Sequence, residues 1–162
     1  MPKLFRRILV PHDLSEHASR ALRVAADLAA GRGGRLEVLH VVPLVEMVAF
    51  AAPVTGVPAF IPPPDMRERD RKQLEVVVRR VLGRRRTPKV RCRIVLGDPA
   101  QEIVQAARRA DSIVMSTAGR TGLAHLVIGS VAEKVVRHSR TPVLTLPARS
   151  RAGGRGRRRR RA

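Results

Sequence analysis

Short runs of aliphatic residues alternate along this chain with longer segments in which apolar residues recur at helical spacing. This alternation is typical of an α/β fold, in which crossover helices connect the strands of a parallel sheet. The 162 residues suit one domain of ordinary size, and the single cysteine excludes an internal disulfide framework. We therefore expect one domain over residues 1–148, with strands at 8–10, 36–42, 90–96, 112–115 and 142–146.

Helical spacing of apolar residues predicts four helices between these strands. The third is marked most clearly, because Asp98 can cap its amino end, with Pro99 at the first helical position and Gln101 completing a capping box. The strand at 90–96 alternates apolar residues with Arg91 and Arg93, which indicates one solvated face and a position at the sheet edge. The helices are expected to begin at Ser15, before Leu74, at Asp98 and at Ser130, and the first two end near Gly31 and Gly83.

The chain is strongly basic, with 33 Lys and Arg against 13 Asp and Glu and a net charge of +20. Residues 149–162 hold eight arginines and no acid, and such a segment cannot bury apolar surface, so we expect a disordered tail there. Without these eight the net charge is +12. One hypothesis is that Arg157–Arg161 bind polyanions such as nucleic acid without sequence preference, and the alternative is a solvated tail with no ligand. Three Phe are the only aromatic residues, which excludes a stacking platform for nucleic-acid bases.

Residues 44–64 form the longest apolar stretch, but they contain five prolines and Glu46. A membrane-spanning helix does not accommodate that combination, so we expect residues 43–65 to be a mobile cover near a ligand pocket or a dimer contact. The apolar run 8–10 stops at Pro11 and is too short for an export signal. The sequence therefore predicts a cytoplasmic protein without a membrane anchor.

The sequence lacks the dinucleotide-binding glycine motif, the phosphate loop of nucleoside triphosphatases and the nucleophile elbow of hydrolases. A different glycine-containing loop, residues 116–129, lies between the apolar strand 112–115 and the last helix. Ligands of open parallel sheets bind at the carboxyl ends of strands, and a helix amino end suits phosphate. This pattern favours a phosphate site to which Arg120 adds a charged contact. The alternative is that Ser130 caps its helix with Glu133 and the glycines only turn the chain.

Together these segments resemble the universal stress protein family, whose nucleotide-binding members carry the motif G-x2-G-x9-G-[ST] after the fourth strand. Gly119, Gly129 and Ser130 match the last two glycines and the hydroxyl residue, whereas Ser116 stands where the motif has its first glycine. The resemblance covers most of residues 5–147. Its other matching segments are Ile8–Ser15, Leu39–Val42, Val131–His138 and Thr141–Leu144.

The resemblance implies a five-stranded, parallel, open sheet of Rossmann-like type, with helices on both faces and strand order 3-2-1-4-5. It also implies ATP or AMP as the ligand, Mg or Mn held together with the phosphates, and a homodimer formed through the last strand, Pro142–Leu146. By position, Asp13 and Val41 would contact the nucleoside and Pro11 and Met115 would line its pocket. Gly119, Gly129, Ser130 and Val131 would hold the phosphates. We add Ser116 and Arg120 as candidates at this end of the site, Ser116 at the position of the missing glycine and Arg120 for its charge.

Ser116 is the departure from the family motif, and its effect depends on the backbone. If the position requires a positive φ, the side chain costs about 1 kcal/mol. If it requires only close approach, the hydroxyl can donate to a phosphate and offset part of that loss. We therefore expect ATP to bind more weakly than in a site with the full motif, and Ser116→Gly to tighten its binding by about 1 kcal/mol, about fivefold.

Three other features have a simpler interpretation beside the functional one. Asp13 could cap the first helix, with Glu16 three residues on, instead of contacting a ribose. His12 and His17 are five residues apart and do not share a helical face, which argues against a metal site. Cys92 alternates with apolar residues, so we interpret it as a packing residue rather than a redox thiol.

The leading hypothesis is a cytoplasmic stress-response protein that acts as a nucleotide-dependent regulator or sensor. The sequence has neither paired carboxylates nor a base beside the glycine loop, so we expect at most slow ATP hydrolysis or self-phosphorylation rather than a dedicated enzyme. The alternatives are a dimeric interaction module that binds no nucleotide, and a protein associated with nucleic acid through its Arg-rich tail.

Overall fold

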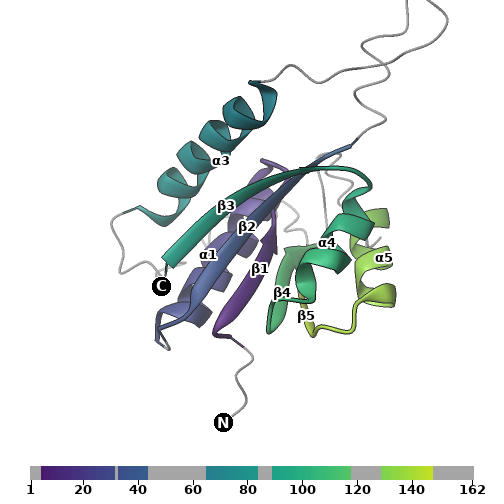
Figure 1. The fold of residues 1–162 in the computed structure, drawn as a ribbon. Coiled ribbons are helices and arrows are strands. Elements are labelled where there is room, and N and C mark those ends of the chain that lie inside the picture. The colour runs from purple at the N-terminus through teal and green to yellow at the C-terminus, as the bar shows by residue number, and fades with distance from the viewer. Residues whose placement is uncertain (1–4, 32, 44–64, 84–88, 118–128, 148–162) are drawn as a thin grey trace, which may run out of the picture.

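The computed structural model describes residues 5–31, 33–43, 65–83, 89–117 and 129–147. Within these ranges, strands and helices alternate along the chain (Figure 1). The strands are β1 (Arg7–Pro11), β2 (Arg35–Val42), β3 (Lys89–Leu96), β4 (Ser112–Ser116) and β5 (Val143–Leu146). The helices are α1 (Glu16–Ala30), α3 (Met66–Leu82), α4 (Pro99–Ala107) and α5 (Ser130–His138).

The five strands form one parallel sheet in the order β3-β2-β1-β4-β5. This order confirms the Rossmann-like α/β fold expected from the sequence. It also places β3 at an edge, as the alternation of Arg91 and Arg93 with apolar residues predicted. The last strand begins one residue later than expected, at Val143, and the carbonyl of Pro142 accepts a 2.8 Å hydrogen bond from the Ile113 N–H.

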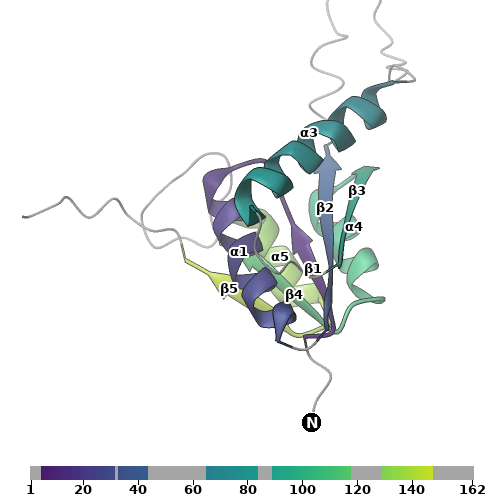
Figure 2. The same cartoon turned by 90° about the vertical axis from the view of Figure 1, so that its left-hand side faces the viewer.

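Helices cover both faces of the sheet and enclose two apolar cores. Ile8 and Val10 of β1 pack with α1 and α3 on one face, whereas Leu9 packs with α4 and α5 on the other. Figure 2 shows α1 and α3 together on one side of the sheet. These three side chains of β1 are at most 1% exposed, as expected for a central strand of a parallel sheet buried on both faces.

The amino ends of α1 and α4 are fixed by side-chain caps. Ser15 caps α1, and its Oγ accepts a hydrogen bond from the Ala18 N–H at 3.1 Å. The alternative that Asp13 caps this helix is therefore wrong; its Oδ1 instead accepts from the Ser15 N–H at 3.1 Å. Asp98 caps α4 as predicted, with Oδ1 accepting from the Gln101 N–H at 2.9 Å.

Cys92 lies on β3 and is partly buried against the core formed with α1 and α3. Burial raises the pKa of its thiol, so the reactive thiolate is disfavoured at neutral pH. Both observations support its interpretation as a packing residue.

Several predictions concern residues outside the described ranges. They include residues 44–64 of the cover expected over residues 43–65, the Arg-rich tail at 149–162, and Gly119 and Arg120 in the glycine loop. None of the helices in the described ranges combines the length and hydropathy that a membrane span needs.

Candidate functional site

A cavity of about 490 Å³ opens at the carboxyl ends of β1, β2 and β4. Its position follows from the topology, because parallel strands bring their carboxyl ends to one edge of the sheet. The start of α5 closes one part of the wall, and α3 and α4 contribute Asp70, Gln73, Pro99 and Ile103.

Eight of the ten residues expected at the site surround this one cavity. The other two, Gly119 and Arg120, lie outside the described residues. The structure thus brings the described candidates together, while their contacts with a ligand stay predictions. The eight are Pro11, Asp13, Val41, Met115, Ser116, Gly129, Ser130 and Val131.

The turn after β1 has an unusual backbone that its own side chains support. Leu14 has a φ of 67°, in the left-handed region that side-chain-bearing residues rarely adopt. Its N–H donates to Nδ1 of His12 at 3.0 Å, and the next N–H, of Ser15, donates to the Asp13 carboxylate. These two bonds fix the turn and hold the Asp13 carboxylate at the cavity wall.

His12 is a buried part of this turn that sequence reasoning did not assign to the site. It is 2% exposed, and burial lowers the pKa of its imidazole to about 4, so the ring is neutral at pH 7. Its Nε2 lies 3.4 Å from Oγ of Ser19, and its carbonyl oxygen lies 2.7 Å from Nδ1 of the buried His40 on β2. These contacts connect the β1 turn to α1 and β2.

The start of α5 differs from the predicted cap. Gly129 occupies the cap position and no side chain of the described residues caps the helix, so the alternative that Ser130 does so with Glu133 is wrong. Ser130 is the first helical residue and is exposed. The cavity is therefore bordered by a helix amino end whose first N–H groups have no side-chain cap among the described residues.

Gly129 is required by close packing rather than by an unusual backbone angle. Its φ is −58°, but a Cβ added there would lie 2.9 Å from the Thr117 carbonyl oxygen. The same oxygen accepts a 2.8 Å hydrogen bond from the Gly129 N–H. This contact joins the end of β4 to the start of α5 across the cavity wall.

Ser116 is the last residue of β4 and pairs with Leu146 of β5. Among the described residues, Leu14 is the only non-glycine with a positive φ, so Ser116 has an ordinary strand backbone. The strain that would have favoured glycine here is absent. The positive-φ reason for expecting Ser116→Gly to tighten ATP binding is therefore wrong, and the effect of this substitution on the affinity stays a prediction.

The described wall of the cavity is acidic rather than basic. Asp13 and Asp70 line it, whereas no Lys or Arg of the described residues does. Within the described ranges, no group of three or more His, Cys, Asp or Glu residues could hold a metal ion. Asp70 and Gln73 were not expected at the site, because the sequence pattern does not show which residues of α3 reach the sheet edge.

An open parallel sheet with a cavity at its carboxyl edge is the architecture of a Rossmann-like α/β protein, and ligands of such sheets bind at that edge. The sequence model of the universal stress protein family matches residues 4–147, and the chain belongs to this family.

Known proteins are similar to this chain in sequence and in structure over nearly the whole domain. A universal stress protein of Thermus aquaticus is 33% identical over 146 residues, which cover 87% of this chain and 98% of the relative. The solved structure of the hypothetical protein MJ0577 of Methanocaldococcus jannaschii has a TM-score of 0.72 and 25% identity, and covers 91% of this chain and 99% of its own. A universal stress protein of Archaeoglobus fulgidus, solved in complex with dAMP, has a TM-score of 0.58 and 23% identity, with 88% and 98% of the two chains covered.

Proposed function

We propose that the cavity at the carboxyl ends of the strands binds an adenine nucleotide, ATP or AMP, and that the protein is a nucleotide-dependent regulator in a stress response. The observation that carries this proposal is the amino end of α5, which borders the cavity next to Gly129 and which no side chain of the described residues caps. Backbone N–H groups and the positive end of the helix dipole are suited to a phosphate. Since no Lys or Arg lines the described wall, this backbone site is the main source of attraction there.

The nucleoside would occupy the part of the cavity between β1, β2 and β4. Pro11, Val41 and Met115 offer apolar surface for a base, and Asp13 offers a carboxylate for ribose hydroxyls. A carboxylate accepts several hydrogen bonds, so the bond from the Ser15 N–H is compatible with that role. The relative solved with dAMP supports an adenine nucleotide as the class of ligand to test.

A divalent ion fits this proposal through charge rather than through a cluster of protein ligands. Asp13 and Asp70 line the same cavity in which the phosphates would lie. The negative charges of these carboxylates would repel those of the phosphates. Mg²⁺ is commonly bound by one or two carboxylates together with substrate phosphates. We therefore expect Mg or Mn to strengthen ATP binding, with Asp13 or Asp70 as the nearest protein oxygens.

A homodimer through the last strand forms part of the proposal. β5 is an edge strand, and Leu144 on it is 39% exposed. An unpaired edge with an exposed apolar side chain suits pairing with a second copy. Sedimentation of the natural chain and of Leu144→Lys tests this part, and a monomeric natural chain would contradict it.

Titration calorimetry with ATP and AMP, with and without Mg²⁺, tests the nucleotide site. We expect the natural chain to bind, Gly129→Val to lose binding, and Gly31→Ala to bind as the natural chain does. Gly31 is the matched control, because an added Cβ meets no atom within 4 Å there. Circular dichroism must show that Gly129→Val is folded before its loss of binding counts.

The second candidate is a dimeric interaction module without nucleotide. It is favoured by Ser116, which replaces a motif glycine, and by the exposed edge of β5. A natural chain that dimerises but binds neither ATP nor AMP would favour this candidate.

The Arg-rich tail is the subject of a separate proposal, that it binds DNA or RNA without sequence preference. Truncation after Ala148 should abolish retention of DNA or RNA at low salt and leave the thermal stability nearly unchanged.

A further inference from the structure

We infer that the opposite end of the sheet carries a second site, for a small anion with several phosphate groups. A cavity of about 670 Å³ lies at the amino ends of β1, β2 and β3, away from the cavity described above. Among the described residues, five basic side chains and one acidic side chain line it. They are Arg7, Arg35, Lys89, Arg91 and Arg109, with Glu37 as the acid.

Three of these basic residues form a row across neighbouring strands. Arg7 of β1 pairs with Arg35 of β2, which pairs with Lys89 of β3. Residues in register on adjacent strands point to the same face, and the strands are about 4.8 Å apart. Like charges placed opposite one another are destabilising in the absence of a counter-charge. The row therefore favours an anion that touches several strands at once.

Within the described ranges, most of this positive charge has no acidic partner. Arg7 is paired with Asp111, whose Oδ1 accepts from Arg7 NH2 at 2.8 Å, and Glu37 is engaged by Arg93 at 3.2 Å. In the described part of the chain, no acidic side chain forms a salt bridge with the other four basic residues of the wall, although Glu37 is in register with Arg91 on the neighbouring strand. Those four are Arg35, Lys89, Arg91 and Arg109.

The basic composition of the chain does not explain this concentration of charge. The cavity at the carboxyl ends is lined by two acids and by no Lys or Arg of the described residues, so the charge is distributed unevenly between the two ends. The carboxyl ends of α1 and α4 also border the amino-end cavity through Ala30 and Ala106. Each helix end contributes roughly half a negative charge, which reduces the repulsion within the basic cluster. Most of the positive charge of the cluster is left uncompensated by these two helix ends.

The shape and chemistry of the cavity favour a small phosphorylated anion over a nucleic acid. Its volume lies within the range of small-molecule sites, and a duplex is too wide to enter it. No aromatic side chain belongs to the described wall, so bases have no surface on which to stack. The Arg guanidinium groups can each donate two parallel hydrogen bonds to a phosphate. Recognition would thus depend on the phosphates alone.

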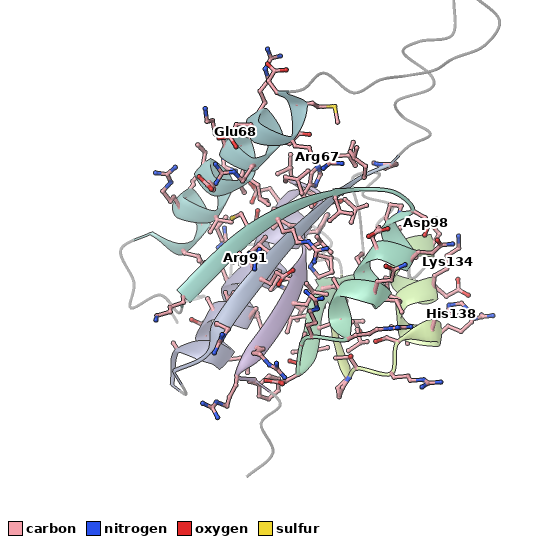
Figure 3. The ribbon with its side chains drawn as sticks, viewed as in Figure 1. Arg67, Glu68, Arg91, Asp98, Lys134 and His138 are labelled. Carbon is pink, nitrogen blue, oxygen red and sulfur yellow. The ribbon has the colours of Figure 1, made fainter. Side chains whose placement is uncertain are left out.

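The experiment compares tripolyphosphate binding to three full-length proteins by titration calorimetry at low and moderate salt. The double variant Arg91→Gln/Arg109→Gln removes two unpaired charges of the wall. The control, Arg67→Gln/Arg108→Gln, removes two exposed charges outside it; Arg108 is the sequence neighbour of Arg109. Figure 3 shows Arg91 on β3 and Arg67 on α3. All four side chains are exposed, so folding should not be affected.

We expect the double variant to bind about tenfold more weakly than the natural chain, and the control to bind within about twofold of it. The Arg-rich tail is present in all three proteins, so a difference in affinity between the double variant and the control is not due to the tail. Equal affinities of the double variant and the control would overturn the site. Loss of tripolyphosphate binding in Gly129→Val would also overturn it, because the probe would then occupy the other cavity. If a single-stranded oligonucleotide bound more tightly than tripolyphosphate and lost binding in the same double variant, the small-anion assignment would be wrong.

Discussion

The backbone nitrogen of Leu14 lies 3.0 Å from Nδ1 of His12, two residues earlier in the same turn. Because Nδ1 accepts this hydrogen bond, the proton of the neutral ring is on Nε2, which faces Oγ of Ser19. The pair holds Leu14 in its left-handed conformation, which costs roughly 1–2 kcal/mol for a residue with a side chain. The neutral form of a buried histidine is therefore part of the turn that carries Asp13.

The stability of the protein should depend on pH through His12. Burial lowers its pKa from 6.5 to about 4 in the folded state, so between these values the unfolded chain binds more protons. The free energy of unfolding should therefore rise with pH across this window, by up to about 1.4 kcal/mol per pH unit. Above pH 6.5, His12 should cause no further rise. Urea denaturation at pH 4.5, 5.5 and 7 measures this slope.

The variant His12→Asn should flatten the pH slope, since a side-chain oxygen can still accept from the Leu14 N–H but does not titrate. His138→Asn, at an exposed histidine of α5, serves as the control and should keep the slope of the natural chain. An unchanged slope in His12→Asn would assign the pH dependence to other groups.

Gly129→Ala should destabilise the protein by about 1–3 kcal/mol, because the new Cβ would lie 2.9 Å from the backbone oxygen of Thr117 and neither strand nor helix can move easily. Gly31→Ala should be neutral or slightly stabilising, since its φ of −73° and open surroundings suit alanine. Thermal unfolding of the two variants checks this contrast. Equal melting temperatures would show that the Gly129 contact is not tight in solution.

Ser112→Ala should stabilise the protein by about 1 kcal/mol. Its Oγ is buried and has no hydrogen-bond partner among the described residues, so the hydroxyl was desolvated without compensation. Ser19→Ala is the matched comparison, because Ser19 is equally buried but its Oγ donates to the Ser15 carbonyl at 3.0 Å. We expect this second variant to lose about 1 kcal/mol in the free energy of unfolding. The prediction fails if chemical denaturation gives both changes the same sign.

Ser116→Gly should change ATP affinity by less than about twofold, because Ser116 has no positive φ to relieve. The same variant should lower the free energy of unfolding by about 0.5–1 kcal/mol, the usual cost of glycine inside a strand. Calorimetric titration and urea denaturation measure the two effects. A fivefold gain in affinity would instead mean that close approach of the phosphate to this backbone limits binding, and Ser116→Ala would show whether the Cβ is the obstacle.

Much of the fold could be predicted because it depends on local patterns. Alternation around Arg91 and Arg93 identified an edge strand, and Asp98 marked the start of α4. The residues of the carboxyl-end cavity could be grouped because parallel strands end at one edge. Resemblance to a known family then supplied the strand order, which no local pattern contains.

The remaining details depend on packing that the sequence does not display. Asp13 and Ser15 are both good helix caps, and periodicity does not distinguish positions two residues apart. The burial of His12 follows from how α1 and β2 enclose the turn. The row of Arg7, Arg35 and Lys89 appears only once the register between the strands is known.

β2 extends from one cavity to the other, with Arg35 at its amino end and Val41 near its carboxyl end. They are six positions apart along an extended strand, about 20 Å, which exceeds a Debye length of about 8 Å at physiological salt. Between them, Leu36, Val38 and Leu39 are at most 1% exposed, so this part of the strand is packed into the two cores. Two ligands bound at its ends would therefore act additively: each should raise the melting temperature by its own increment, and the affinity of either should not change when the other site is saturated.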